Sequence, residues 1–454
     1  MSFQSINPAT GELLAEFGTW DASALEDALA RADDAARQWR ATPLAERTRI
    51  IANAGRLLRE QVEPLARLAS LEMGKPITEA RAEVEKSAWA CDYFAEHAEA
   101  MLRPEPVQTD ASHSYISYQP LGTVLAIMPW NFPYWQVLRH MAPTLAAGNT
   151  LLLKHAPNVP QVAQAIERLA LEAGVPEGVF INLPIDVDLI EAVIADPRVH
   201  AVTLTGSERA GRSVAELAGR HLKKVVLELG GSDAFVVLED ADLDLAVSQA
   251  VPARFQNGGQ SCIAAKRIIL TEPVAENFTG RFVEAVRALR VGDPLDEATQ
   301  IGPVARADLR DELHRQVRAS IDAGAQLAAG GAPIEGPGYF YQPTVLDRVG
   351  PGMTAYSEEL FGPVATLIHA RDEAQALAIA NDSRFGLGGC VWTRDTERGE
   401  RFAAALESGG AFVNGMFKSD PRLPFGGIKA SGYGRELSIH GIREFVNTKT
   451  LWVR

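Results

Sequence analysis

The sequence predicts an α/β fold of two doubly wound sheets, and three observations lead to this prediction. Apolar, strand-like segments alternate with helical segments from about residue 121 to residue 229, and a second alternating set runs from about Ala234 to Ser408. Strands that alternate with helices favour parallel sheets with helices on both faces. The length of 454 residues fits two or three domains, at roughly 100–200 residues per domain.

The elements can be assigned in order along the chain. Residues 21 to about 100 are predicted to be helical, because apolar residues such as Leu25, Leu29 and Ala32 recur at steps of three and four. A short strand or β-ribbon follows at Tyr115–Gln119. The strands predicted for the first sheet are Thr123–Met128, Thr150–Leu153, Val179–Leu183, His200–Leu204 and Val225–Leu229. Four helices are predicted between these strands. The first begins after Pro133, the second spans about Pro160 to Ala173, the third ends at about Ala195, and the fourth begins at about Glu208. The second set includes the strands Val236–Leu238, Arg267–Leu270, Thr366–Ile368 and Gly389–Trp392, and the tail Phe445–Val453 is predicted as one more strand.

The composition excludes several classes of function. The chain has 44 Lys and Arg against 58 Asp and Glu, a net charge of −14. An acidic chain without runs of Lys or Arg is not expected to bind nucleic acid or an anionic membrane, so we expect neither as a partner. No apolar run approaches the roughly 18–20 residues of a membrane helix, and the N-terminal residues lack a secretory pattern. The three widely spaced cysteines fit neither a disulfide framework nor a metal site, so we expect a cytoplasmic protein without a bound metal.

One of these cysteines, Cys262, is a candidate nucleophile. It ends the segment Phe255–Cys262, whose glycines and small polar residues are typical of an exposed loop ahead of an apolar segment. A thiol in such a loop can be reached by a substrate and can be deprotonated. The alternative is a small buried thiol, which is the usual fate of a single cysteine.

Two further polar residues follow predicted strands. Glu228 lies at the end of the strand Val225–Leu229, before two glycines that let a substrate approach, and this place suits a general base. A surface glutamate in a turn is the alternative. Asn131 lies between a strand and a helix, where its side-chain N–H can donate to a developing oxyanion, unless the segment is only a rigid aromatic turn.

A cofactor site is indicated more weakly. Thr205, Gly206 and Ser207 follow a strand and begin a helix, and backbone N–H groups at such a point suit a pyrophosphate. No Gly-x-Gly-x-x-Gly motif follows a strand, so the standard dinucleotide fingerprint is absent from the sequence.

Taken together, these segments resemble the aldehyde dehydrogenase superfamily, from Asn7 to the end of the chain. The matching motifs, in order, are Pro-Trp-Asn-Phe-Pro at 129–133, Thr-Gly-Ser at 205–207, Glu-Leu-Gly-Gly at 228–231, Gly-Gln-Ser-Cys at 259–262, Glu-Glu-Leu-Phe-Gly-Pro at 358–363 and Pro-Phe-Gly-Gly at 424–427. The interval between Glu228 and Cys262 also matches the family.

The resemblance implies an aldehyde dehydrogenase-like fold in three parts. A dinucleotide-binding domain would comprise residues 1–101 and 121–229, and a catalytic domain would comprise residues 230–440. A β oligomerisation arm would comprise residues 102–120 and 441–454. In that arm the tail strand would pair with another subunit's sheet, giving a homodimer or a dimer of dimers.

The resemblance also implies roles in the oxidation of an aldehyde to an acid. Cys262 attacks the aldehyde carbon, and Asn131 and the Cys262 backbone N–H hold the oxyanion. Hydride transfer to the nicotinamide leaves a thioester, and Glu228 activates the water that releases the acid. Lys154 is counted among the catalytic residues, and Glu436 joins a proton path behind Glu228. The residues implied in cofactor binding are Ile127, Met128, Pro129, Trp130, Lys154, His155, Pro157, Gly206, Ser207, Leu229, Gly230, Glu359 and Phe361.

The cofactor implied is NAD, with NADP as the alternative. The family often has a glutamate three residues after the lysine at position 154, where it accepts from the adenosine ribose. Here the run is Lys154-His155-Ala156-Pro157, so that carboxylate is missing. Without its charge a 2′-phosphate is less strongly excluded.

The substrate is predicted from the helix after Pro133. The residues expected to line the substrate tunnel are Phe132, Trp135, Gln136, Arg139, Ser261 and Phe425. An arginine at position 139 is similar to the short bacterial succinate-semialdehyde dehydrogenases, where it binds the far carboxylate. The second carboxylate-binding arginine of that family is Gln256 here, with Arg254 two residues earlier. The alternative for Arg139 is an ion pair on the helix surface, with a short or medium aliphatic aldehyde as substrate.

Two other functions remain as alternatives. A CoA-acylating semialdehyde dehydrogenase shares the fold and the nucleophile, but that branch lacks the water-activating glutamate that Glu228 supplies. A non-catalytic structural protein with this fold is disfavoured because Cys262, Glu228, Asn131 and Lys154 are all present.

Overall fold

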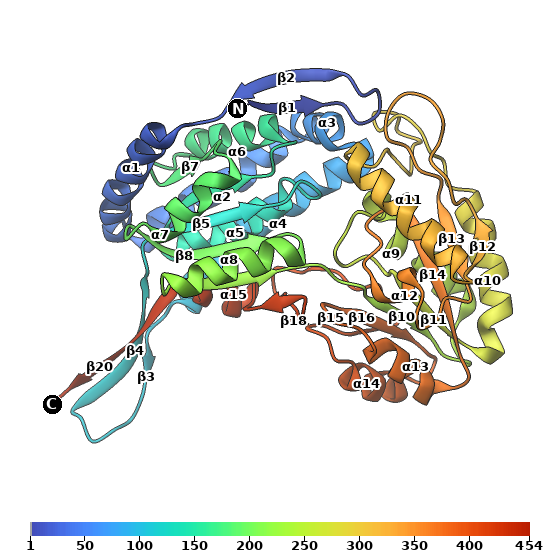
Figure 1. Cartoon of the computed structure of the whole chain (residues 1–454). Helices are drawn as coiled ribbons and strands as arrows, with labels where there is room; N and C mark the ends of the chain where they lie inside the picture. Colours follow the sequence, from blue (N-terminus) through green and yellow to red (C-terminus); the bar gives the residue numbers. More distant parts are fainter. Residues whose placement is uncertain (1) are drawn as a thin grey trace.

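The computed structural model describes residues 2–454 and has two large sheets, each with helices on both faces (Figure 1). The chain begins with a hairpin of β1 (Ser2–Ile6) and β2 (Leu13–Gly18). Four helices follow, α1 (Ala22–Ala41), α2 (Leu44–Glu60), α3 (Val62–Met73) and α4 (Ile77–Met101). The predicted helical region is therefore confirmed, whereas the hairpin was not predicted.

The first sheet has the order β19-β9-β8-β5-β6-β7, and all its pairs except β19 with β9 are parallel. Its strands are β5 (Thr123–Met128), β6 (Thr150–His155), β7 (Phe180–Asn182), β8 (Val199–Thr205), β9 (Lys224–Glu228) and β19 (Gly432–Tyr433). The connecting helices are α5 (Trp135–Ala146), α6 (Pro160–Ala173), α7 (Ile190–Ala195) and α8 (Glu208–Arg220), with a 3-10 turn at Val187–Leu189. Each strand predicted for this sheet is confirmed within two residues at either end.

Both faces of this sheet are buried. Val124 and Ala126 of β5 belong to the core formed with α2 to α6. Leu125, between them, belongs to a second core formed with α1, α7 and α8. Because successive side chains of a strand point to opposite faces, one apolar strand supplies both cores.

The second sheet has the order β12-β13-β14-β11-β10-β16-β17, and only β12 with β13 is antiparallel among its described pairs. Its strands are β10 (Ala234–Val237), β11 (Arg267–Thr271), β12 (Gln326–Ala329), β13 (Thr344–Asp347), β14 (Val364–Ala370), β16 (Gly389–Trp392) and β17 (Phe412–Val413). The helices around it are α9 (Leu243–Phe255), α10 (Glu272–Arg287), α11 (Ala307–Asp322), α12 (Thr354–Ser357), α13 (Glu373–Asn381) and α14 (Thr396–Ala405). Val237 packs with α9 and α10, and Val236 packs with α11, α13 and α14. The predicted doubly wound architecture is thus confirmed in both halves.

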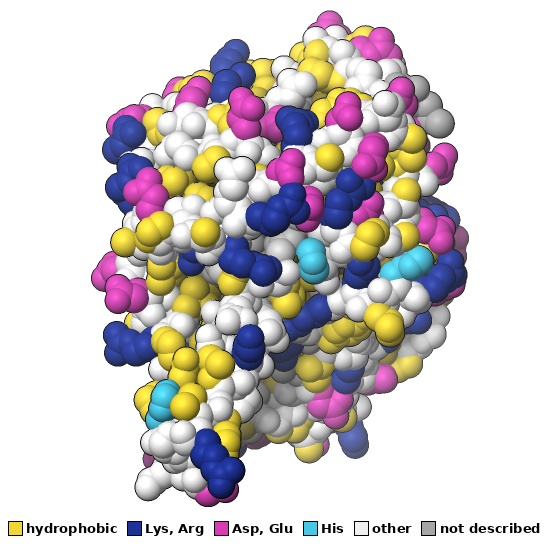
Figure 2. Space-filling view, turned by 90° about the vertical axis from the view of Figure 1, so that its left-hand side faces the viewer, with side chains coloured by type: hydrophobic (Ala, Val, Ile, Leu, Met, Phe, Trp, Pro, Cys, Tyr) yellow, Lys and Arg dark blue, Asp and Glu magenta, His cyan; other side chains and the backbone are white. Residues whose placement is uncertain are grey.

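A three-stranded arm projects from the body of the molecule (Figures 1 and 2). It consists of β3 (Glu105–Pro106), β4 (His113–Pro120) and β20 (Val446–Val453), which follows α15 (Ser438–Glu444). β20 pairs along the whole of β4 in the same chain. One edge of the tail strand therefore pairs within its own chain, and the pairing of its other edge with another subunit stays a prediction. β20 is an edge strand, and Trp452 on it is 49% exposed.

The fold brings several chain segments to one place. The carboxyl ends of β5, β8 and β9 lie at the same edge of the first sheet, because these strands are parallel. The short antiparallel pair of β15 (Phe385–Gly386) and β18 (Ile428–Lys429) leads the chain back from the second half to this sheet. Ligands of open α/β sheets bind outside the carboxyl ends of the strands, so this edge is where a site is expected. Within residues 2–454, no helix is long and apolar enough to span a membrane.

Candidate active site

Cys262 lies between two cavities. One has a volume of about 210 Å³ and the other of about 240 Å³, and Cys262 and Gln136 line both. Cys91 and Cys390 are buried, whereas Cys262 is half-buried. The alternative of a buried, inaccessible thiol at position 262 is therefore wrong. A reagent in either cavity can reach this sulfur.

The loop that carries Cys262 is held in an unusual backbone conformation. Asn257 and Gly258 have φ of 56° and 60°, in the left-handed region. The Asn257 side chain donates to the carbonyl of Asn131 at 2.8 Å and of Gln260 at 3.1 Å. At Gly259, also with positive φ, a Cβ would lie 2.2 Å from the Gly362 carbonyl oxygen, so only glycine fits. The glycines that predicted an accessible loop are thus needed for a second reason: at Gly259 they let the loop pack closely against the Gly362 segment.

Asn131 lies directly beside this loop. Its Nδ2 donates to the Gln260 carbonyl at 3.1 Å, and it lines the cavity of about 240 Å³. A side-chain amide has two N–H groups, so one remains to donate to a ligand. The amide is held in place by the same loop that carries the nucleophile.

The thiol of Cys262 is surrounded by charges of both signs. Burial raises its pKa to about 12, while Lys266 and Arg139 act to lower it and Glu359 and Asp233 act to raise it. At neutral pH the thiol therefore carries its proton. Attack on a substrate needs either more positive charge beside the sulfur or a base that removes the proton.

The residues predicted to bind substrate line one common cavity. Phe132, Trp135, Gln136, Arg139, Ser261 and Phe425 all border the cavity of about 210 Å³. Arg139 is 2% exposed, so the alternative of an ion pair on the helix surface is wrong. Its Nε lies 2.5 Å from Glu436 Oε2, and its guanidinium lies 4.9 Å from the Phe425 ring centroid. Nη2 of Arg139 has no hydrogen-bond partner among the described residues, so a donor remains for a ligand.

A second cation in this cavity was missed by sequence reasoning. Lys86, in α4, lines the cavity, donates to Ser419 Oγ at 2.8 Å, and lies 4.4 Å from a ring centroid of Trp135. Burial, and then the charge of Arg139, lower the pKa of Lys86 to about 8. A lysine within an amphipathic helix ordinarily faces solvent, so the sequence held no signal for this position.

Glu228 and Glu436 form a buried acidic pair beside Arg139. Glu228 is 2% exposed, and neither of its oxygens has a hydrogen-bond partner among the described residues. Burial, and then the charge of Glu436, hold the pKa of Glu228 well above its usual range. Burial also raises the pKa of Glu436, against the effect of Arg139. Glu228 is not among the residues that border either cavity, so its side chain must turn to reach a substrate there.

The cavity of about 240 Å³ collects most of the predicted cofactor residues. It is bordered by Pro129, Trp130, Asn131, Gln136, Thr205, Gly206, Ser207, Leu229, Gly230, Cys262, Leu309, Glu359 and Phe361. The rings of Trp130 and Phe361 meet edge to face with centroids 5.8 Å apart. Ser207 caps α8 by accepting from the Ala210 N–H, and a Cβ at Gly206 would meet only Leu204, at 3.6 Å. This open start of a 13-residue helix fits a pyrophosphate.

The remaining predicted cofactor residues lie elsewhere on the same sheet edge. Ile127 and Met128 end β5, and Lys154, His155 and Pro157 lie at or just after the end of β6. His155 borders a separate cavity of about 200 Å³ together with Phe3 and Asn182. The Lys154 ammonium lies 5.7 Å from the Phe3 ring centroid. The unpredicted N-terminal hairpin therefore reaches the region assigned to the adenosine half of the cofactor.

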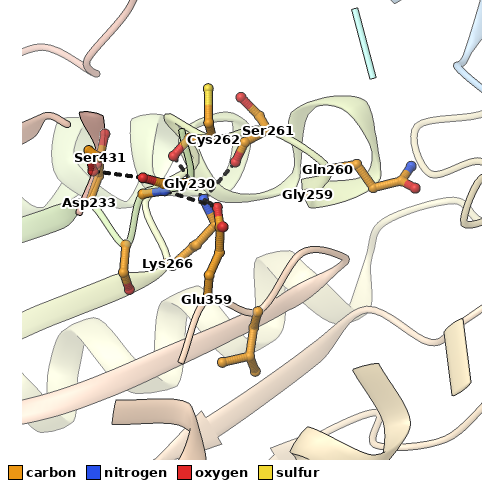
Figure 3. A network of polar contacts seen from close by, with 12 residues as sticks. Gly230, Asp233, Gly259, Gln260, Ser261, Cys262, Lys266, Glu359 and Ser431 are labelled. Atoms are coloured by element: carbon orange, nitrogen blue, oxygen red, sulfur yellow. Dashed lines mark hydrogen bonds and ion pairs between the residues drawn. The ribbon is translucent and has the colours of Figure 1, made fainter. Parts of the chain in front are cut away.

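A buried lysine joins the nucleophile loop to Glu359 (Figure 3). Lys266 Nζ donates to the carbonyls of Ser261 at 2.6 Å and Cys262 at 2.9 Å, and it lies 3.0 Å from Glu359 Oε1. The same oxygen of Glu359 accepts from the Gly231 N–H at 3.1 Å. Sequence reasoning passed over Lys266, although its place four residues after a candidate nucleophile was a signal.

Comparisons with known proteins identify the family. The family model described as "Aldehyde dehydrogenase family" matches residues 1–451. A succinate semialdehyde dehydrogenase of Escherichia coli K12, named for NAD(P)+, is 52% identical over 99% of this chain and 97% of that protein. A succinate-semialdehyde dehydrogenase of Mycobacterium ulcerans, named for NADP+, is 49% identical over the full length of both. The crystal structure of a succinic semialdehyde dehydrogenase from Streptococcus pyogenes with NADP+ superposes with a TM-score of 0.98, at 40% identity and 99% coverage of both chains.

Proposed function

The chain belongs to the aldehyde dehydrogenase family, and from that premise we propose that it oxidises succinate semialdehyde to succinate with NAD(P)+. One observation carries the proposal: Cys262 borders two cavities at once, and one of them is lined by two cations, the buried Arg139 and the half-buried Lys86. The cavity with Arg139 and Lys86 takes the aldehyde, and the cavity at the start of α8 takes the cofactor. The thiol then stands between the two reacting molecules.

The chemistry follows from the positions of these groups. The Cys262 thiol releases its proton to solvent as the sulfur attacks the aldehyde carbon, a loss that the positive charge of a bound oxidised nicotinamide would favour. The Asn131 side chain and the Cys262 backbone N–H stabilise the oxyanion that forms. The cofactor, when bound, supplies the acceptor for the hydride that leaves the substrate carbon, and a thioester on Cys262 remains. Glu228, once it has turned toward the thioester, takes a proton from water so that the acid is released. Glu436 lies behind Glu228 and passes that proton on.

The arrangement of the cofactor follows the residues at the sheet edge. Gly206, Ser207 and Trp130 would face the pyrophosphate, and Phe361 would lie against the nicotinamide. Lys154, at the end of β6, would hold the adenosine ribose. No carboxylate follows Lys154 in the run to Pro157, so nothing in that run repels a 2′-phosphate, in keeping with relatives named for NADP+ as well as NAD(P)+. We assign NAD(P)+, and the two cofactors are compared directly by their kcat/KM.

The competing function is acyl transfer to CoA. The experiment measures reduced cofactor with succinate semialdehyde, with and without CoA, and identifies the product. We expect succinate to form at the same rate in both cases, because Glu228 provides a base for water. A requirement for CoA, with a succinyl thioester as product, would overturn the proposal.

Arg139 is expected to recognise the far carboxylate of the substrate. A guanidinium that donates to a carboxylate contributes about 1.5–3 kcal/mol, a factor of roughly 10 to 150 in affinity. We expect Arg139→Ala to lower kcat/KM for succinate semialdehyde by that factor more than for butanal, mostly through KM, because the far carboxylate does not react. The measurement is kcat/KM for both aldehydes with both proteins.

The comparison of two aldehydes is needed because Arg139 has two partners. Its removal also leaves Glu436 without its cation, which affects every substrate alike. The ratio of the two kcat/KM values cancels that shared loss. Equal losses for both aldehydes would show that Arg139 serves only Glu436.

Lys86 gives the same recognition a dependence on pH. Its pKa of about 8 means that it is charged below pH 8 and neutral above. The groups that influence it are Arg139, Glu83, Asp420 and Lys418, of which Arg139 acts most strongly. We expect KM for succinate semialdehyde to rise about tenfold as pH increases from about 7 to 9. KM for butanal should not follow this rise, and Lys86→Met should abolish it; a rise that persists in Lys86→Met would assign it to another group.

We also propose a division of the chain into three parts and an assembly through one of them. Residues 1–101 and 121–229 bind the cofactor, residues 230–440 carry the nucleophile, and residues 102–120 with 441–454 form the arm. The exposed edge of β20, with Trp452 and Val453 on it, supports an assembly of two or four chains through the arm.

A further inference from the structure

Lys266 is a buried cation held by two hydrogen bonds and one ion pair. It is 1% exposed, and its ammonium reaches three acceptors: the carbonyls of Ser261 and Cys262, and the carboxylate of Glu359. An ammonium has three N–H groups, so no donor is left over. The Phe361 ring, 5.8 Å away, covers it further. A cation buried this completely must be held by its partners, and two of these are the nucleophile loop and Glu359.

The contact with the Ser261 carbonyl fixes the direction of a second group. In a trans peptide the C=O and the following N–H point in opposite directions. The ammonium draws the Ser261 oxygen to one side, so the Cys262 N–H points to the other. Figure 3 shows the Cys262 sulfur projecting to that opposite side, away from Lys266. Within residues 2–454 the Cys262 N–H donates to no acceptor, so it is free for a ligand.

We propose that Lys266 is a positioning residue that aims the Cys262 backbone N–H at the oxyanion and holds Glu359 at the cofactor cavity. The inference rests on the proposed function, because it supposes acyl chemistry at Cys262. One ammonium thereby connects the N–H group that donates to the substrate oxygen with the cofactor side of the site. A single side chain thus fixes the position of the oxyanion donor relative to the cofactor cavity.

The geometry on the cofactor side supports this link. Glu359 borders the cofactor cavity and is held from behind by Lys266 and by the Gly231 N–H. A Cβ at Gly230 would lie 2.2 Å from Glu359 Oε2, so the carboxylate is pressed against that glycine. Without the ammonium the carboxylate keeps one donor, the Gly231 N–H, and loses its counter-charge. Removal of the Lys266 ammonium should therefore weaken cofactor binding as well as the contact between the Cys262 N–H and the oxyanion.

The test compares two reagents that react with the same thiol without cofactor. p-Nitrophenyl acetate acylates the sulfur through a tetrahedral oxyanion, whereas iodoacetamide alkylates it by displacement with no oxyanion. Both depend on thiolate, which Lys266, Arg139, Glu359 and Asp233 all influence, so the ratio of the two rates cancels that shared dependence. We expect Lys266→Met to lower the ratio of acylation to alkylation about 100-fold, the size seen when an oxyanion donor is lost. Lys266→Arg, which keeps the charge, should recover much of the ratio.

A matched control is the neighbouring Arg267. It is also buried, and it donates to the carbonyls of Ser232, Ile379 and Ala380, away from the nucleophile loop. Arg267→Met should lower the melting temperature and leave the ratio unchanged. Lys266→Gln serves as a second variant if Lys266→Met does not fold. The cofactor half is measured separately as Kd for NADP+, which we expect to weaken about tenfold in Lys266→Met and not in Arg267→Met.

The outcomes separate this inference from the proposed function. If neither reagent modifies Cys262 in the unsubstituted protein, as mapped by peptide mass spectrometry, the proposed function fails. If both modify it and Lys266→Met lowers the two rates equally, Cys262 stands as the nucleophile and the positioning role is overturned. An unchanged Kd in Lys266→Met would overturn the cofactor half of the inference.

Discussion

Cys262→Ala is expected to abolish aldehyde oxidation, with a loss on the order of 10⁴–10⁶-fold, while NADP+ still binds. The thiol is the group that forms the covalent bond to the substrate, and no neighbouring side chain can replace it because the other two cysteines are buried elsewhere. Binding should persist because the cofactor cavity is formed by residues of β8, α8 and the Glu359 segment as well. The measurements are steady-state turnover and Kd for NADP+ in the same preparation.

The control for this prediction is Cys390→Ala. Cys390 is buried in the second sheet, in β16, so its removal should lower stability and leave kcat/KM near that of the unsubstituted protein. If Cys262→Ala retained more than about one hundredth of the turnover, covalent catalysis by this thiol would be disproved.

The two sheets could be predicted because their strands are covered on both faces. A strand such as β5 or β6 then appears as a continuous apolar segment, which separates cleanly from the amphipathic helices on either side. The hairpin of β1 and β2 gave no such signal, because most of its residues are half-buried or exposed, with Leu13 54% exposed. Its place beside β6 and α6 results from tertiary contacts that a local pattern does not record.

The candidate site divides in the same way. Cys262, Asn131 and Gly206 lie in loops at strand ends, where glycines and polar residues mark the sequence itself. Lys86 could not be predicted, because a lysine in a helix is ordinarily exposed and only packing from distant segments covers it. Lys266 had a sequence signal in its place four residues after Cys262, but its burial and its contact with Glu359 are visible only in the structure. Arg139 was predicted as a ligand of the substrate, but its second partner, Glu436, lies far along the chain.

The pairing of Arg139 with Glu436 changes how the general base should be understood. Arg139 touches both the substrate cavity and the acid that lies behind Glu228. A substrate carboxylate and Glu436 therefore compete for one guanidinium. When the substrate takes part of that interaction, Glu436 loses stabilisation of its charged form and holds a proton more readily. The base and the substrate-binding group are coupled through this residue.

Glu228→Gln is expected to separate the two halves of the reaction. Attack by Cys262 and hydride transfer need no base at this position, so one equivalent of reduced cofactor per subunit should form rapidly. Hydrolysis of the thioester then lacks its base, and we expect the steady-state rate to fall by about 100-fold or more. Stopped-flow absorbance of the reduced cofactor resolves the burst from the slow phase.

The pH dependence provides an independent check of the same assignment. Burial and the charge of Glu436 raise the pKa of Glu228, so the carboxyl is protonated below that pKa and can accept a proton from water only above it. The steady-state rate of the unsubstituted protein should therefore increase with pH through the raised pKa of Glu228, whereas the rate of Glu228→Gln should not. The variant is nearly isosteric and keeps the side chain uncharged, as the buried environment prefers. Two outcomes would show that Glu228 is not the base and that water reaches the thioester by another route. One is steady-state turnover of Glu228→Gln at the rate of the unsubstituted protein. The other is a slow steady-state rate without a preceding burst of reduced cofactor.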